Sequence, residues 1–152
     1  VDMIFQRVNR TDPERVFVVM RNNEGAAMIA NQTCQLELAS ASIDGVRVRD
    51  MDTGNLHNFI GVVDAAIADG AYGLIQVYGY RSTSIVFQTG TSVATGQLLM
   101  AVAGQDYFET VASTLASSTT VTIQPIFAIL GESITDQATS STVTRKIFIR
   151  AL

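Results

Sequence analysis

The stretch YGLIQVYGYRSTSIVFQ, at residues 72–88, indicates the fold class of this protein. It contains two short runs, 72–80 and 83–88, that are rich in β-branched and aromatic residues. Such runs are typical of β-strands rather than helices. Gly73 and Gly79 interrupt the first run, and glycine inside a strand indicates a bulge or a close approach of another backbone. We therefore predict β-strands at 72–80 and 83–88.

The same pattern continues on both sides of this stretch. Short apolar runs alternate with turn residues, while helix-favouring charged residues are scarce, with one Lys and five Glu in 152 residues. We expect an all-β fold in a single domain spanning 1–152: an antiparallel β-sandwich or barrel of about ten short strands, with little or no helix. The candidate strands, some of which should merge or fail, are 3–8, 15–21, 26–29, 33–39, 46–49, 59–63, 72–80, 83–88, 98–102, 107–111, 120–130 and 144–152.

The two halves of the chain show a weak internal similarity. Residues 30–36 resemble residues 95–100, and 59–62 resemble 126–129, at separations of about 64 to 67 residues. Chance similarity between short apolar strands would account for this. The alternative is a pair of equivalent β units at about 15–80 and 83–152.

Composition and charge limit the possible partners. Charged residues make up 16% of the chain and the formal net charge is −4, without the basic surface typical of nucleic-acid-binding proteins. One Cys and one His can form neither an internal disulfide nor a Cys/His zinc site. The uncharged stretches 82–105 and 110–131 are interrupted by Ser, Thr, Gln and Gly, and no signal peptide is visible. We expect no nucleic-acid partner and no membrane partner.

Residues of the kinds used in catalysis are few and scattered. His57 lies in a polar connector without a second His or a nucleophile motif, and the alternation around Cys34 favours a small core residue. We expect no enzyme activity, no catalytic residue, no cofactor and no metal. Turn formation explains the loosely clustered acidic residues, with a calcium site or a catalytic carboxylate pair as alternatives. These residues are Asp44, Asp50, Asp52, Asp64 and Asp69.

The basic residues are almost all arginine, with nine Arg to one Lys. Arg47 and Arg49 alternate with Val46 and Val48, so both guanidinium groups lie on one side of a short strand. Arginine suits bidentate contacts at a protein surface. The alternative is a solvated strand edge that prevents strand addition.

The last predicted strand alternates between two faces. Lys146, Phe148 and Arg150 lie on one face, and Ile147 and Ile149 lie on the other. Phe148 therefore lies among cations. It is either shielded by the stems of these side chains or used as an interface contact.

Segments covering most of the chain resemble capsid cement proteins, also called head decoration proteins, of tailed bacteriophages. The resemblance consists of strand and turn segments, and the segments 106–118 and 132–141 match nothing in that family. It is carried by ERVFVVMRN (14–22), ANQ (30–32), GVVDAA (61–66), DGAYGLIQVYGY (69–80) and KIFIRAL (146–152).

This resemblance implies a structural virion protein without enzyme activity. Such proteins bind the outer surface of an icosahedral capsid, commonly as homotrimers at junctions between major capsid proteins. The implied partners are thus the major capsid protein and further copies of the chain, and the implied location is the outer capsid surface of a virion assembled in the host cytoplasm. Low charge suits such a role, because interface cores are depleted in Lys, Glu and Asp. The candidate capsid contacts are Arg7, Arg10, Arg47, Arg49 and Phe148.

Two other functions fit the sequence. A tail or baseplate protein, or a minor shell subunit, of the same kind of particle has the same composition. A carbohydrate-binding β-sandwich would stack tyrosine rings on sugars beside the acidic loops, although the chain lacks Trp. The tyrosines for that role are Tyr72, Tyr78, Tyr80 and Tyr107.

Overall fold

The computed structural model describes residues 13–38, 45–51, 56–88, 92–111, 126–135 and 140–151. Within these ranges the chain forms nine β-strands and one turn of 3-10 helix, η1 (Leu56–Asn58). The strands are β1 (Arg15–Asn22), β2 (Thr33–Leu36), β3 (Arg47–Asp50), β4 (Phe59–Val63), β5 (Tyr72–Gln88), β6 (Leu98–Ala101), β7 (Phe108–Thr110), β8 (Ala128–Leu130) and β9 (Ser141–Arg150).

The all-β prediction is confirmed, with differences in individual strands. The predicted strands 72–80 and 83–88 form one strand of 17 residues, β5, because the chain continues from one half of the structure into the other without a turn. Residues 26–29 contribute only an isolated bridge, between Met28 and Ile67. The predicted strand 3–8 lies outside the described residues, and the described part of 120–130 forms a strand only in β8.

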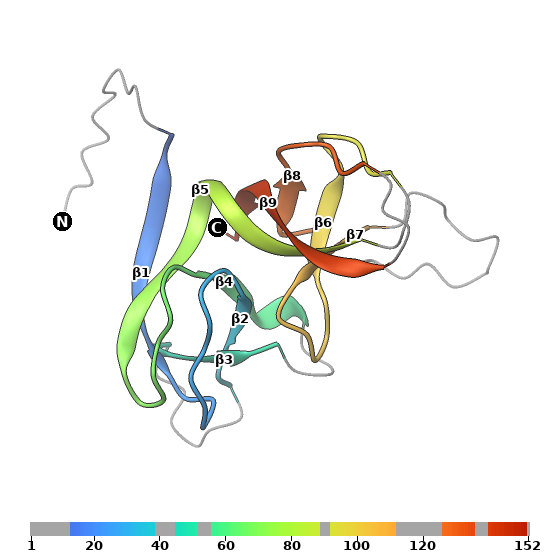
Figure 1. Cartoon of the computed structure of the whole chain (residues 1–152). Helices are drawn as coiled ribbons and strands as arrows, with labels where there is room; N and C mark the ends of the chain where they lie inside the picture. The colour runs from blue at the N-terminus through green and yellow to red at the C-terminus, as the bar shows by residue number, and fades with distance from the viewer. Residues whose placement is uncertain are drawn as a thin grey trace, which may run out of the picture.

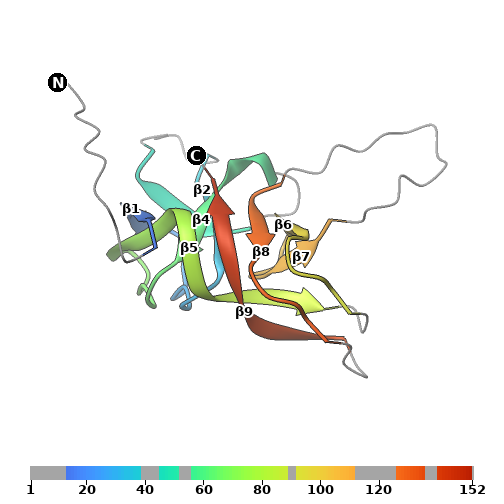
Figure 2. The same ribbon diagram turned by 90° about the horizontal axis from the view of Figure 1, so that it is seen from above.

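The strands pair into two closed rings that share β5 (Figures 1 and 2). We call the ring β1–β3–β2–β4–β5, closed by pairing of β1 with β5, the first barrel. The ring β5–β7–β6–β8–β9, closed by pairing of β9 with β5, is the second barrel. Most pairs are antiparallel, as predicted, but β1–β3 and β5–β7 are parallel. Closure removes most free strand edges from both barrels.

The strand β5 serves both barrels because it changes partner along its length. Its first half pairs with β1 and its second half with β9, and the register shifts in both pairings. Gly79 lies where the partners change, with a φ of 96°, and a Cβ atom there would overlap the carbonyl oxygen of Glu14. A Cβ atom on Gly73 would overlap the side chain of Ile67. The prediction that both glycines mark close packing is confirmed.

The second barrel repeats the pairing pattern of the first. In each barrel the opening strand pairs with the closing strand in antiparallel and with the third strand in parallel. Asn31 and Gly96 both have positive φ and lie just before β2 and β6. Asn31 N–H donates to Val63 O at 2.9 Å, and Gly96 N–H donates to Leu130 O at 2.8 Å. The isolated bridges recur as well, as Met28–Ile67 and Val93–Ile134.

Each barrel has an apolar core, and the first barrel contributes to the core of the second. Met51, Phe59 and Val62 belong to the first barrel and its loops but pack into the second core. The ring of Phe59 stacks on Phe127 at a centroid distance of 4.4 Å and meets Phe108 edge-on at 5.6 Å. The first core consists of Met20, Met28, Cys34, Val48, Val63, Ile67, Ile75 and Val77.

A buried arginine occupies the middle of β5, where the two barrels meet. Arg81 donates hydrogen bonds to Asp64 Oδ1 at 3.0 Å, Gln76 Oε1 at 3.1 Å, Asn31 Oδ1 at 2.8 Å and Val63 O at 2.9 Å. Burial lowers the pKa of Arg81, and the hydrogen bond and charge of Asp64 oppose this effect. Charged side chains are buried at low cost only when paired, so these acceptors stabilise Arg81 inside the fold.

Candidate functional site

The structure places Cys34 and His57, the two residues considered for catalysis, in different surroundings, one in a core and one at the surface. Cys34 lies in the first core, where its thiol donates to Gly61 O at 3.4 Å. Burial, together with the charge of Asp50, strongly raises the pKa of this thiol, so it stays protonated. The prediction of a core cysteine is confirmed. His57 lies exposed in η1, and no group of His, Cys, Asp and Glu in the described ranges is arranged to hold a metal ion.

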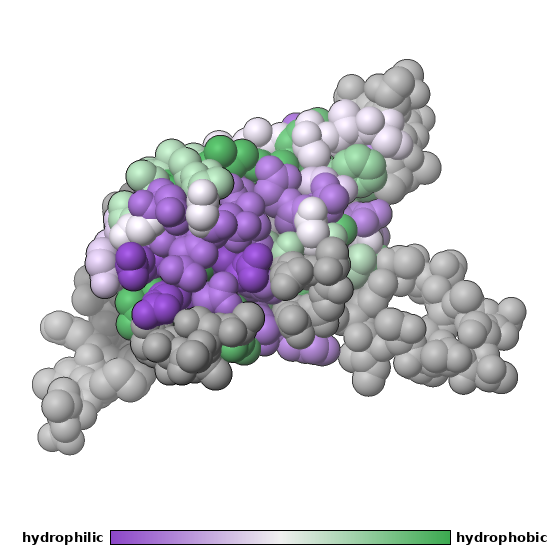
Figure 3. All heavy atoms as spheres, turned by 90° about the horizontal axis from the view of Figure 1, so that it is seen from below, coloured by the Kyte–Doolittle hydropathy of each residue, from purple (hydrophilic) through white to green (hydrophobic). Residues whose placement is uncertain are grey.

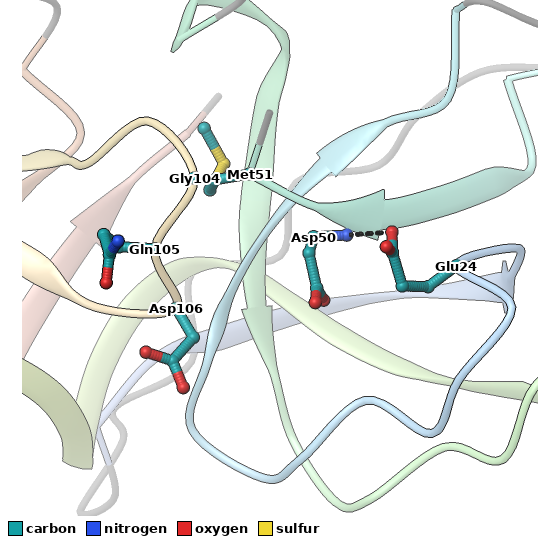
Figure 4. Close-up of a pocket in the computed structure, with 6 residues that line it drawn as sticks. All are labelled: Glu24, Asp50, Met51, Gly104, Gln105 and Asp106. Atoms are coloured by element: carbon teal, nitrogen blue, oxygen red, sulfur yellow. Dashed lines mark hydrogen bonds between the residues drawn. The ribbon is translucent and has the colours of Figure 1, made fainter. Parts of the chain in front are cut away.

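A polar cavity lies where the loops of the two barrels meet, and it has a volume of about 420 Å³. Glu24 and Asp50 line it from the first barrel and Asp106 from the loop between β6 and β7, with Asp50 in the middle (Figure 4). The carboxylate of Glu24 accepts a hydrogen bond from the Asp50 N–H at 3.0 Å. Burial raises the pKa of Asp50, and the charges of Glu24 and Asp106 raise it further. A hydrogen bond from Gln32 and the charge of Arg49 act in the opposite direction.

The described acidic residues of the cluster predicted from the sequence have structural roles that sequence reasoning described only in part. Asp69 accepts a hydrogen bond from Gly25 N–H at 3.0 Å, as expected for a loop aspartate. Asp50 belongs to β3 rather than to a turn, so turn formation does not explain it. Asp64 is paired with Arg81. Asp44 and Asp52, the other members of the predicted cluster, lie outside the described residues.

The predicted arginine contacts separate into two groups. Arg47 and Arg49 lie on β3 on either side of the buried Val48, as the alternation predicted. Arg49 forms ion pairs with Glu24 at 3.4 Å and with the buried Glu37 at 3.6 Å. It thus links β3 to the neighbouring segments of its own chain, which reduces its availability to a partner. Arg7 and Arg10 lie outside the described residues.

The structure confirms the predicted alternation along β9. Ile147 and Ile149 are buried in the second core, whereas Lys146 and Arg150 are exposed. Phe148 is half-buried and packs edge-on against Tyr78, with ring centroids 5.3 Å apart. An aromatic neighbour therefore shields Phe148 in addition to the cationic stems considered from the sequence.

Sequence reasoning missed an exposed apolar surface on the pair β1–β5. Val19 and Tyr72 expose 61% and 65% of their surface, and Leu74 lies directly opposite Val19 in the strand register. We call Val19, Tyr72 and Leu74 the apolar ribbon face. Arg21 lies opposite Tyr72 at its end. The unbroken apolar run 16–20 contained the signal for this surface. A strand that is apolar on both faces is normally covered on both faces.

Other surfaces have a different character. The face seen from below in Figure 3 is largely hydrophilic, with apolar residues toward its margin. The four tyrosines considered for sugar binding do not share one environment, because Tyr72 is exposed whereas Tyr107 stacks on Phe87 at 5.1 Å. Tyr78 is engaged with Phe148. An exposed row of aromatic rings is therefore not formed by these residues.

The comparisons with known proteins add no assignment. No model of a known protein family matches the chain, and no curated protein matches it. In the described part of the chain, no helix has the length and apolar character needed to cross a membrane.

Proposed function

We propose that this chain is a structural virion protein, a cement or decoration protein that binds the outer surface of an icosahedral phage capsid and stabilises contacts between major capsid protein subunits. The sequence resemblance introduces this function, and the apolar ribbon face is the structural observation that supports it best. An exposed apolar group with a polar rim is typical of a surface that contacts another protein.

The geometry of this face suits a flat protein partner. Val19 and Leu74 project from neighbouring strands of one sheet, so they present a continuous surface rather than a concave pocket. Arg21 and Tyr72 lie at its end and supply one charged and one aromatic group, the residue types enriched at protein interfaces. The binding free energy exists only in the assembled shell, so it stabilises that shell against dissociation.

Co-sedimentation with expanded capsids tests this proposal. Leu74→Glu removes an apolar contact and adds a charge, so we expect the affinity for capsids to fall about tenfold to a hundredfold. Thr142→Glu is the matched control, because it places the same side chain at an exposed position of β9. Unchanged capsid binding by Leu74→Glu, or failure of the wild-type chain to bind capsids, contradicts the proposal. Binding to isolated tails instead would support the tail or baseplate function.

A second variant tests the predicted charge contacts. Arg7, Arg10 and Arg47 are replaced together by Ser, while Arg49 is retained because of its ion pairs with Glu24 and Glu37. If these arginines bind carboxylates of the shell, capsid occupancy decreases and becomes less sensitive to salt. Equal occupancy of the triple variant and wild type across a range of salt concentrations would remove the arginines from the interface.

A further inference from the structure

The repeat of the barrels allows one surface of the second barrel to be compared with a covered surface of the first. Thr33, Met51, Phe59 and Val62 form the end of the first barrel that packs on the second. Thr33 N–H donates to Asp106 O at 3.1 Å, and Met51 O accepts from Gly104 N–H at 2.9 Å. Phe59 and Val62 lie in the second core.

The strand register identifies the equivalent residues of the second barrel. Thr33 is paired with Val62 between β2 and β4, and Leu98 is paired with Ile129 between β6 and β8. The bridges and turn hydrogen bonds described above have the same alignment. Cys34 is paired with Asp50 between β2 and β3, and Leu99 is paired with Thr110 between β6 and β7. By these registers the equivalents of Thr33, Met51, Phe59 and Val62 are, in that order, Leu98, Val111, Ile126 and Ile129. We call these four residues the second-barrel end face.

All four residues of the second-barrel end face are apolar, although no second core lies against them among the described residues. Leu98 exposes 37% and Ile126 exposes 41% of its surface, and Val111 and Ile129 are half-buried. In the first barrel the equivalent surface is covered by a barrel of the same pattern. An apolar surface at a position that is covered in the other repeat points to a missing neighbour of similar shape.

The residues that would receive this face are also apolar. Within the chain, the first barrel's end packs on the segment that contains Asp106 and Phe108 and on the ring of Phe127. By the alignment of β3 with β7 and of β4 with β8, the equivalents in the first barrel are Val46, Val48 and Ile60. Val46 is exposed and Ile60 is half-buried, whereas Val48 is fully buried in the first core.

We infer that two copies of this chain associate head to tail, with the second-barrel end face of one copy packed on the Val46 and Ile60 side of the first barrel of the next. The contact repeats between molecules the packing that the two barrels have within one molecule. It joins two different surfaces, so successive contacts close into a ring if the rotation permits and otherwise extend as a chain. This inference does not depend on the proposed capsid function.

Light scattering over a range of concentrations tests the association. We expect the wild-type mass to rise with concentration above the 16.3 kDa of one chain. Ile126→Glu should weaken self-association at least about tenfold, because it places a charge in the contact. Leu74→Glu is the control, since it changes an exposed apolar residue of the apolar ribbon face by the same substitution. A constant mass of one chain, or equal association by wild type and Ile126→Glu, overturns the inference.

Cross-linking tests the orientation. Thr33 and Asp106 lie within hydrogen-bonding distance through their backbones, so their equivalents Leu98 and Val46 are expected to meet across the contact. The double variant Val46→Cys and Leu98→Cys should form intermolecular disulfides under mild oxidation, while Cys34 is buried and stays unreactive. The control pair is Val46→Cys with Leu74→Cys.

The two experiments separate this inference from the proposed function. Equal or absent cross-linking in the two Cys pairs contradicts the head-to-tail contact. If Ile126→Glu lowers the folding stability and the wild-type protein has the mass of a single chain, the second-barrel end face is covered by its own chain. This result also overturns the inference. Self-association of the wild-type chain without binding to capsids contradicts only the proposed function.

Discussion

The buried Arg81 offers a direct test of how the two barrels are held together. In Arg81→Met the aliphatic stem is retained, while the guanidinium group and its hydrogen bonds are lost. Gln76 Oε1 accepts from Arg81 at 3.1 Å, and Gln76 is almost completely buried. Two other acceptors of Arg81 keep a donor when it is replaced. Asn31 Oδ1 also accepts from the Thr83 hydroxyl at 2.9 Å, and Val63 O also accepts from Asn31 N–H.

The magnitude follows from these remaining contacts. One buried acceptor without a donor costs about 1–3 kcal/mol. Breaking a fully buried ion pair costs about 3–5 kcal/mol, but the side chain of Asp64 is 39% exposed and water solvates its carboxylate when Arg81 is removed. We therefore expect Arg81→Met to lower the free energy of unfolding by about 2–3 kcal/mol.

Urea unfolding measures this loss, with Arg150→Met as the control. Arg150 is exposed on β9, so the same substitution there should change stability by no more than about 0.5 kcal/mol. The double variant Arg81→Met and Gln76→Met also removes the amide oxygen that is left without a donor. Its loss of unfolding free energy should be smaller than the sum of the losses of the two single variants by about 1 kcal/mol. A loss below about 1 kcal/mol for Arg81→Met, or strict additivity in the double variant, would refute the reasoning.

Three further predictions concern single sites. The fold raises the pKa of Asp50, so its carboxyl favours the folded state most when protonated, and this stability is lost as the pH rises through the raised pKa. Asp106→Asn should lower that pKa in an NMR titration of the side-chain carboxyl, and an unchanged pKa would contradict the coupling. Gly79→Ala should reduce the unfolding free energy by about 2 kcal/mol or more, because a Cβ atom there overlaps the backbone of Glu14. Gly96 has a positive φ but open space around it, so Gly96→Ala should reduce the unfolding free energy by only about 1 kcal/mol. Equal losses of the two variants in urea unfolding would be inconsistent with the backbone overlap at Gly79. Cys34 should react with a thiol reagent only when the protein unfolds, because burial keeps its thiol protonated and inaccessible; rapid reaction of the folded protein would contradict this.

Local patterns predicted the strands and the buried side of several of them. The alternation along 146–150 depends only on the two-residue period of a strand, and the structure confirms it. Around Cys34 the structure confirms the core cysteine but not the alternation, because Gln35 and Glu37 are buried and Leu38 is exposed. Gly73 and Gly79 were also interpretable locally, since a glycine weakens a strand interior and its presence in an apolar run indicates close packing or a bulge.

The joining of 72–80 and 83–88 into β5 could not be predicted in this way. The polar residues 81–83 separate the two runs in sequence, and a buried Arg81 is stable only because Asp64 and Gln76 meet it in the folded chain. The same holds for the cavity, where Asp106 approaches Asp50 from the other barrel. Partners from distant segments are not encoded in the spacing of neighbouring residues.

The candidate interaction surfaces show this division most clearly. The apolar run 16–20 and the apolar residues near Leu98 and Ile126 were visible as strand-forming segments, because hydrophobicity and β-branching act within a few residues. Which of their faces is covered depends on the packing of two barrels around one shared strand, which brings residues together from across the chain. Composition and periodicity thus predict an all-β protein, whereas the packing of distant segments decides which apolar faces stay exposed.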